Sequence, residues 1–271
     1  MLTRETMEGL YVLVITPFDA KFRLDEEAYR ENIRKLVNLG VHGIVTTGTN
    51  GEFFVVTDQE LQRITRITVE ECRNRAAVII GASAVNTDES IRRSQIAMEE
   101  GADAVMNVIP FYQTLSKPEA YQYFKDLAGA CPQLGIIVYN NPTTSKVRFD
   151  DNDFVRLQEI PTFCGSKMLG ADVALYLNCL RRTKLRHFPL ELLWWVSHCV
   201  GGNGVMASFI YAFPGFMMKW WQAIRKGESS KSLAMQHECN RILQEAVLPL
   251  AAEGYNDTAL TKATVDAAGF F

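Results

Sequence analysis

Four polar segments follow apolar runs and carry the side chains best suited to chemistry. Lys167 matters most among them, because no acidic residue follows it until Asp172 and an ammonium facing the protein interior would be poorly solvated. Desolvation favours the neutral amine, which attacks carbonyl carbon. The alternative is a lysine that points into solvent at a strand end. The four segments are Gly48–Glu52 (GTNGE), Pro110–Tyr112 (PFY), Tyr139–Pro142 (YNNP) and Gly165–Lys167 (GSK).

Tyr139 and the Gly48–Gly51 turn are candidate partners of this lysine. Consecutive strands of a parallel barrel are neighbours, so Tyr139 and Lys167 are expected roughly 5 Å apart. A phenol at that distance can pass protons to and from a carbinolamine. The turn exposes successive backbone N–H groups, which suits a small carboxylate. A rim tyrosine packed on the following proline and an ordinary glycine-rich turn are the structural alternatives.

Eight short apolar runs alternate with amphipathic helical segments, which predicts parallel strands covered on both faces. We therefore predict an α/β fold, a (β/α)8 TIM barrel over residues 1–210 with additional C-terminal helices over 211–271. Capping boxes begin the helices at Thr57 and Ser116. The seventh run is the weakest, because Pro189 suits only a strand terminus. The runs cover 11–18, 43–48, 76–83, 102–110, 134–141, 162–167, 186–191 and 204–208.

The composition excludes several classes of protein. With 271 residues, 48% of them hydrophobic, the chain can bury a large core, and its net charge of −3 offers no basic field for nucleic acid. The apolar runs are too short to span a bilayer and the N-terminus lacks a signal-peptide pattern, so a cytoplasmic location is expected. Six scattered cysteines predict reduced thiols, and no His or Cys spacing predicts a metal site.

Motifs along nearly the whole chain resemble the dihydrodipicolinate synthase and N-acetylneuraminate lyase family of class I aldolases. They run in order from Ile15–Phe18 (ITPF) through GTNGE, the segment ending in PFY, YNNP and GSK to Gly201–Ser208 (GGNGVMAS). The resemblance implies that pyruvate, or the pyruvyl end of a 2-keto acid, is held as a Schiff base on Lys167. It also implies that no metal or organic cofactor is required.

The resemblance assigns roles to further residues. Tyr139 would relay protons, and Thr49 would link it to a second tyrosine, Tyr112, which in family members reaches into a neighbouring subunit's site. A dimer or tetramer is therefore expected. Gly48, Thr49 and Asn50 would hold the keto-acid carboxylate, and the backbone around Val205 and Met206 would border the pocket.

Departures from the family pattern bear on the substrate. Many members have a second threonine at the position of Asn50. The lysine-pathway synthases place an arginine at the position of Thr144 to bind the second substrate's carboxylate, and Lys146 could substitute for it. We therefore place aldol cleavage, condensation or dehydration of a 2-keto-3-deoxy sugar acid first. Dihydrodipicolinate synthase, an aromatic ylidenepyruvate hydratase-aldolase and a non-catalytic keto-acid-binding homologue are the alternatives.

Two further expectations concern the aromatic residues and the C-terminus. Phe53, Phe54, Trp194 and Trp195 could line an apolar second pocket, or they could belong to the core. Family members commonly continue past DAAGFF, so the resemblance implies a C-terminal extension that is short for the family. The segment before the seventh strand is short as well, and a loosened barrel is expected on that side.

Overall fold

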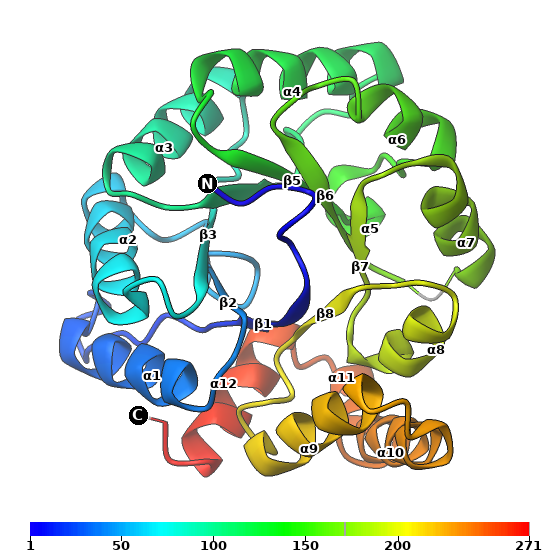
Figure 1. The fold of residues 1–271 in the computed structure, drawn as a ribbon. Helices are drawn as coiled ribbons and strands as arrows, with labels where there is room; N and C mark the ends of the chain where they lie inside the picture. The colour runs from blue at the N-terminus through cyan, green and yellow to red at the C-terminus, as the bar shows by residue number, and fades with distance from the viewer. Residues whose placement is uncertain (171, 271) are drawn as a thin grey trace.

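Eight parallel strands form the centre of the computed structural model, which describes residues 1–170 and 172–270 (Figure 1). Neighbouring strands pair in the order β7-β6-β5-β4-β3-β2-β1-β8. The predicted TIM barrel is confirmed. The strands are β1 (Gly9–Leu13), β2 (Gly43–Thr46), β3 (Ala77–Gly81), β4 (Ala104–Asn107), β5 (Gly135–Asn140), β6 (Phe163–Met168), β7 (Arg186–Phe188) and β8 (Gly204–Ala207).

Helices surround the ring of strands and continue beyond it (Figure 1). In the ring lie α1 (Glu26–Asn38), α2 (Asp58–Cys72), α3 (Thr87–Glu99), α4 (Lys117–Ala130), α5 (Pro142–Ser145), α6 (Asp151–Leu157), α7 (Val173–Arg182), η1 (Glu191–Leu193), α8 (Trp194–Cys199) and α9 (Pro214–Arg225). The remaining elements are α10 (Ser229–Ile242), the π-helical turn η2 (Leu243–Val247), α11 (Leu248–Ala252) and α12 (Asp257–Ala267). Phe271, the last residue of the predicted extension, lies outside the described residues.

Local sequence sets where the helices begin. Thr57 accepts a hydrogen bond from the backbone N–H of Glu60, whose carboxylate accepts one from Thr57 in return, and Ser116 and Glu119 repeat the arrangement. Both predicted capping boxes are therefore present, and they satisfy the free N–H groups of the first turn of α2 and α4.

The amino end of the barrel is filled by the first residues of the chain. Leu2 and Met7 are buried together with Tyr11 and Phe188 in a hydrophobic cluster inside the ring of strands, the inner cluster. The Leu2 carbonyl accepts from Cys164 Sγ at 3.1 Å, and the Leu2 N–H donates to the Asp103 carbonyl at 2.9 Å. This end of the barrel is therefore packed with side chains.

The sector between β7 and β8 is the least regular part of the ring. β7 has three residues and ends before Pro189, as its sequence predicts. The Pro189 carbonyl accepts a hydrogen bond of 3.1 Å from the Met206 N–H, which joins the end of β7 to β8. His187 is fully buried, with Nδ1 2.7 Å from Ser166 Oγ and Nε2 3.0 Å from Thr183 Oγ1.

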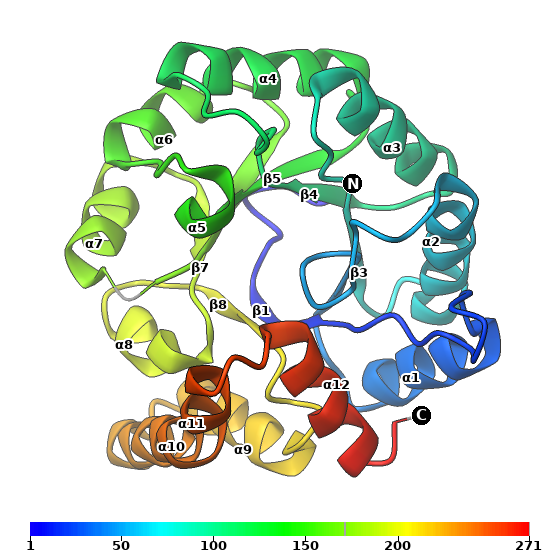
Figure 2. The same cartoon turned by 180° about the vertical axis from the view of Figure 1, so that it is seen from behind.

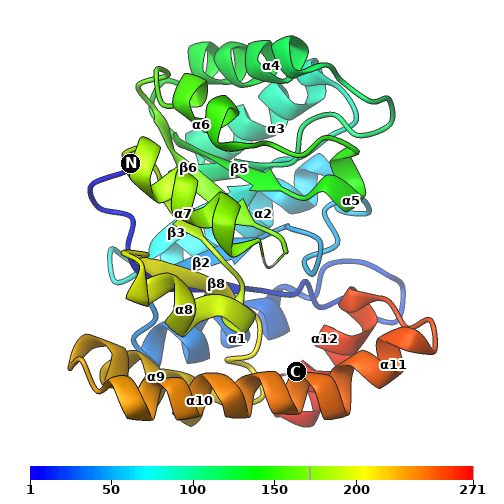
Figure 3. The same cartoon turned by 90° about the vertical axis from the view of Figure 1, so that its right-hand side faces the viewer.

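Helices α11 and α12 lie at the opposite end of the barrel from the N-terminus (Figure 3). Figure 2 and Figure 3 show α11 and α12 at the same end as α5, which follows the carboxyl end of β5. Active sites of TIM barrels lie at this end. Of the helices in the described residues, none is both long enough and apolar enough to cross a membrane.

Candidate active site

Tyr139 and Lys167 face each other across the β5–β6 ladder. The two residues are register partners, and Lys167 Nζ lies 3.9 Å from the centroid of the Tyr139 ring. Both side chains are buried, with exposed fractions of 7% for Tyr139 and 5% for Lys167. An amine in van der Waals contact with an aromatic face is shielded from bulk water on that side.

An irregularity in β6 points the Lys167 side chain into the barrel. Ile136 pairs with Phe163, but Ile137 pairs with Gly165, so Cys164 is an extra residue in the ladder. Phe163 packs in the outer cluster between strands and helices. Strict alternation from Phe163 would direct Lys167 outward as well, whereas the extra residue reverses the alternation.

Gly165 is the residue that makes this bulge possible. A Cβ atom at this position would lie 1.9 Å from the Arg186 carbonyl oxygen of β7. β6 and β7 can approach each other at the bulge only because the side chain is absent.

The Gly48–Glu52 turn follows β2 and lies beside this pair of residues. Thr47 and Glu52, at its two ends, have φ values of 46° and 52°, which are unusual for residues other than glycine. Thr47 Oγ1 donates to the Gly81 carbonyl at 2.9 Å, and Thr16 Oγ1 donates to the Gly51 carbonyl at 2.8 Å. These bonds fix the turn from inside the barrel.

A cavity of about 660 Å³ opens above Tyr139 and Lys167. Its size falls within the range of small-molecule sites, roughly 300–1,000 Å³. Most of the lining is apolar and comes from the ends of the strands and from the C-terminal helices. The lining residues include Leu13, Asn50, Leu169, Leu190, Glu191, Leu192, Ser208, Phe209, Ala212, Phe213, Ile242, Leu243, Ala246, Val247, Leu250, Asp257, Leu260, Thr261 and Thr264.

Glu191 is an acidic residue of the cavity wall that sequence reasoning missed. Its side chain is 6% exposed, and Oε1 accepts from the Phe209 N–H at 3.2 Å. Burial raises the pKa of the Glu191 carboxyl, and the positive charge of Lys167 opposes part of that rise. The sequence pattern that could have identified Glu191 is its place two residues after Pro189, where the seventh strand was expected to end.

The other predicted site residues divide into two groups. Thr49 and Gly48 are half-buried in the turn, and Thr144 is half-buried in α5, where its N–H donates to Asn141 Oδ1 at 3.3 Å. Val205 and Met206 are fully buried within β8, and Ser208 and Phe209 line the cavity just beyond that strand.

Tyr112 lies on the surface of this single chain. It is 75% exposed, and its carbonyl accepts a hydrogen bond of 2.9 Å from Lys146 Nζ. The structure therefore does not bring Tyr112 together with Tyr139 and Lys167 within one chain. The Lys146 side chain is held at Tyr112 and does not line the large cavity.

The four aromatic residues considered for a second pocket lie elsewhere. Phe54 is exposed, and Trp194 is buried against Trp220 and Trp221 on the outside of the barrel. None of the four lines the 660 Å³ cavity, whose aromatic side chains besides Tyr139 are Phe209 and Phe213. Trp194 therefore belongs to the core, the alternative left open by the sequence.

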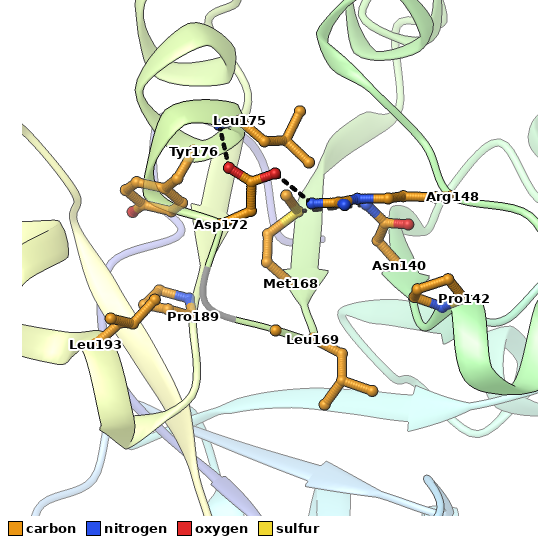
Figure 4. A pocket seen from close by; sticks show the side chains of 11 residues that line it. Asn140, Pro142, Arg148, Met168, Leu169, Asp172, Leu175, Tyr176, Pro189 and Leu193 are labelled. Atoms are coloured by element: carbon orange, nitrogen blue, oxygen red, sulfur yellow. Dashed lines mark hydrogen bonds and ion pairs between the residues drawn. The ribbon is translucent and has the colours of Figure 1, made fainter. Parts of the chain in front are cut away.

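Arg148 belongs to a separate, smaller cavity of about 20 Å³ (Figure 4). One of its guanidinium nitrogens lies 2.6 Å from Asp172 Oδ2, and the second carboxylate oxygen of Asp172 caps α7 by accepting from the Leu175 N–H. The charge of Arg148 is thus matched within the chain. Asn140 and Met168, which follow Tyr139 and Lys167 in β5 and β6, line this smaller cavity, whereas Tyr139 and Lys167 line the larger one.

Within residues 1–170 and 172–270, no group of three or more His, Cys, Asp or Glu side chains is arranged to hold a metal ion. All six cysteines are free thiols, and five of them are buried.

The chain is similar to known proteins over most of its length. Residues 6–261 match the model of the dihydrodipicolinate synthetase family. The 4-hydroxy-tetrahydrodipicolinate synthase of Methanopyrus kandleri is 29% identical over 239 residues, covering 86% of this chain and 79% of that protein. The N-acetylneuraminate lyase of Salmonella paratyphi B is 26% identical over 243 residues, covering 88% and 81%.

Among solved structures, a similar one is YagE, a prophage protein of E. coli K12 that belongs to the dihydrodipicolinic acid synthase family and was solved in complex with pyruvate. It shares a TM-score of 0.88 and 22% identity with this chain, and the match covers 98% of this chain and 89% of YagE. At this identity the likeness shows the fold.

Proposed function

Because the chain belongs to the dihydrodipicolinate synthetase family of class I lyases, we propose that Lys167 forms a Schiff base with pyruvate or a 2-keto acid. The observation that carries the proposal is the contact between Lys167 Nζ and the Tyr139 ring at 3.9 Å, beneath a cavity large enough for a small molecule. Nucleophile and proton carrier come from adjacent strands, which fixes their separation.

The reaction would proceed through an imine. The neutral amine of Lys167 adds to the C2 carbonyl, and the carbinolamine hydroxyl leaves as water after it receives a proton from Tyr139. In cleavage, the Tyr139 phenolate left by that step takes the proton of the C4 hydroxyl, the C3–C4 bond breaks, and its electrons move to the iminium nitrogen. The aldehyde leaves, Tyr139 returns the proton to C3 of the enamine, and hydrolysis of the resulting imine releases pyruvate and the free amine.

The carboxylate of the keto acid would bind at the Gly48–Glu52 turn. Asn50 lines the cavity with Lys167, and backbone N–H groups of such a turn suit a carboxylate. Thr49 would connect Tyr139 to Tyr112 of a second copy of the chain. In this proposal the protein is a homo-oligomer, which accounts for a tyrosine that is 75% exposed in one chain.

The cavity wall favours an apolar or aromatic partner over the sugar acid that the sequence placed first. A sugar acid carries several hydroxyls, and each one buried without a partner costs about 1–3 kcal/mol. Leu190, Phe209, Phe213 and Leu243 offer no such partners. A ylidenepyruvate-type substrate, to which water adds across the C3=C4 double bond before the C3–C4 bond is cleaved, therefore fits the lining best.

The sugar acid remains the second candidate, because Glu191 and Ser208 on one side and Asp257 and Thr261 on the other are polar. Aspartate semialdehyde is less favoured, since Thr144 carries no charge and Arg148 is paired with Asp172.

Borohydride trapping tests the proposal. With pyruvate, the wild-type protein is expected to gain one reduced adduct, mapped by mass spectrometry to Lys167. The Lys167→Ala variant should gain none, and Lys184→Ala, which removes an exposed lysine, should match the wild type. A wild-type protein that stays unmodified, or a Lys167→Ala protein that is still modified, would refute the proposal.

A substrate panel tests the choice of partner. An aromatic ylidenepyruvate should turn over faster than a 2-keto-3-deoxy sugar acid or the pair of pyruvate and aspartate semialdehyde. The opposite ranking would return the sugar acid to first place.

A further inference from the structure

Helix α12 contacts the Gly48–Glu52 turn at two points. Thr258 Oγ1 donates a hydrogen bond of 3.1 Å to the Thr49 carbonyl, and Lys262 Nζ forms an ion pair with the Glu52 carboxylate. Thr258 and Lys262 are four residues apart and share one face of the helix. Lys262 Nζ also lies 4.6 Å from the centroid of the Phe18 ring.

The Gly48–Glu52 turn needs support, because its backbone is strained. Positive φ values at Thr47 and Glu52 cost on the order of 1–3 kcal/mol each, and they persist only where neighbouring groups hold them. Thr47 holds the start of the turn through the Gly81 carbonyl, and Thr16 holds its later part through the Gly51 carbonyl. The Glu52 backbone is hydrogen-bonded to Thr49 and Val55, and the Glu52 side chain is held by Lys262 of α12.

The segment just after the turn is fixed by Arg93 of α3. This buried guanidinium donates to the carbonyls of Phe53 and Val56 at 3.2 and 2.6 Å. The turn is therefore bonded to Thr16 after β1 and to Gly81 of β3, the segment that follows it is bonded to α3, and α12 bonds to Thr49 and Glu52.

The same helix forms part of the cavity wall. Leu260, Thr261 and Thr264 of α12 line the cavity that contains Asn50, Tyr139 and Lys167. Phe270, which follows α12, fixes the carboxyl end of the helix, because its ring packs edge-on against Tyr211 with centroids 5.0 Å apart. α12 is thus held at both ends and bridges the turn and the wall.

We propose that α12 acts as a clamp on the Gly48–Glu52 turn, with Thr258 and Lys262 as positioning residues for the carboxylate-binding backbone. Neither residue touches the reacting atoms. The inference rests on the proposed function for its kinetic consequence, whereas its structural consequence can be measured without any substrate.

The proposal predicts that loss of the α12 contacts weakens pyruvate binding more than it slows imine formation. Without Lys262 the Glu52 carboxylate loses its partner, the strained end of the turn relaxes, and Asn50 shifts with it. Lys167 and Tyr139 belong to β6 and β5 and keep their places. The pyruvate concentration that gives half-maximal trapping should rise about tenfold, and the trapping rate at saturation should stay within about twofold of wild type.

The experiment uses four variants of the whole chain. Lys262→Met and Thr258→Val remove the two contacts one at a time, and Lys262→Arg restores the ion pair. Asp266→Asn changes an exposed charge on the same helix and serves as the matched control. Circular dichroism confirms that each variant is folded.

Two measurements are made on every variant. The first is the pyruvate dependence of borohydride trapping, and the second is hydrogen exchange of the amides of residues 48–56 in the absence of ligand. Lys262→Met and Thr258→Val should raise both the half-saturating concentration and the exchange rate, while Lys262→Arg and Asp266→Asn should match the wild type.

The outcomes separate the two proposals. A wild-type protein that forms no adduct contradicts the proposed function, and the exchange rates still decide whether α12 holds the turn. If the wild type forms the adduct and Lys262→Met changes neither quantity, the clamp is refuted. The clamp is also refuted if Lys262→Met lowers the saturating rate and leaves half-saturation unchanged.

Discussion

The β5–β6 side and the β7–β8 side of the barrel differ in the length of their strands, and the difference separates the proposed reacting residues from the proposed substrate wall. β5 and β6 have six residues each and pair from Ile136 to Asn140, which holds Tyr139 against Lys167. β7 has three residues, and the Pro189 carbonyl joins it to β8. Glu191 and Phe209, which follow these two short strands, line the cavity with the C-terminal helices. The proposed reacting pair thus lies on two long strands that stay paired through the bulge at Cys164, and part of the proposed substrate wall follows two short strands.

The largest expected effect is on the rate of imine formation, and it concerns the β5–β6 side. Tyr139→Phe removes the proposed proton carrier and keeps the ring against Lys167, so imine formation with pyruvate should slow by roughly 10²–10⁴-fold. Stopped reactions trapped with borohydride measure the rate. The control is Tyr121→Phe, which removes a phenolic hydroxyl from a ring of α4 that packs against Arg156 of α6. It should react at the wild-type rate. A near-normal rate in Tyr139→Phe would remove this phenol from the mechanism.

The second effect tests the boundary between the two sides. Gly165→Ala places a methyl group 1.9 Å from the Arg186 carbonyl, so β6 and β7 must separate, and the free energy of unfolding should fall by at least about 3 kcal/mol. Gly129→Ala is the matched control, because a Cβ there meets nothing within 4 Å in α4 and should stabilise by roughly 0.5–1 kcal/mol. Urea unfolding measures both. Equal stability of the two variants would contradict the role assigned to the bulge.

A third effect depends on pH and concerns the β7–β8 side, and it is small near neutral pH. Burial lowers the pKa of His187 from 6.5 to about 3, so the folded state keeps the imidazole neutral while the unfolded state takes up a proton. Its contribution is complete above about pH 6.5 and is lost as the pH falls toward about 3, with a slope of up to about 1.4 kcal/mol per pH unit. His187→Gln should flatten the pH dependence of urea unfolding in this window. Parallel curves for variant and wild type would contradict the assignment.

The smallest effect has the opposite sign. Burial raises the pKa of Glu191, so its ionisation weakens the folded state as the pH rises from about 4.5 through the higher folded value. Glu191→Gln keeps an acceptor for the Phe209 N–H and should be more stable than wild type at neutral pH, with no difference near pH 4. Thermal unfolding at the two pH values measures this, with exposed Glu253→Gln as control. A stabilisation that is equal at both pH values would point to another cause.

Sequence alone could place the reacting pair, because parallel strands that follow one another along the chain become neighbours. Tyr139 and Lys167 are register partners for this reason. The inward direction of Lys167 was not predictable from alternation, since it depends on the extra residue at Cys164. A glycine two positions before the lysine was the visible signal.

The cavity wall could not be predicted from sequence, because it forms between segments far apart in the chain. Thr258 meets Thr49 across 209 positions, and no local pattern announces such a contact. Trp194 and Phe54 had the right chemical character for a substrate wall, yet one packs outside the barrel and the other is exposed. Hydrophobicity identifies candidates for burial and does not say which cavity they border.

The packed amino end of the barrel has a kinetic consequence. Leu2 and Met7 fill that end, and the large cavity above Tyr139 and Lys167 lies toward the other end, where α12 forms part of its wall. Under the proposed reaction, the aldehyde must depart through this cavity before the imine is hydrolysed and pyruvate follows. Pyruvate, which leaves last, binds the same free enzyme as the substrate and should inhibit competitively with respect to it. The aldehyde, which leaves first, should inhibit noncompetitively.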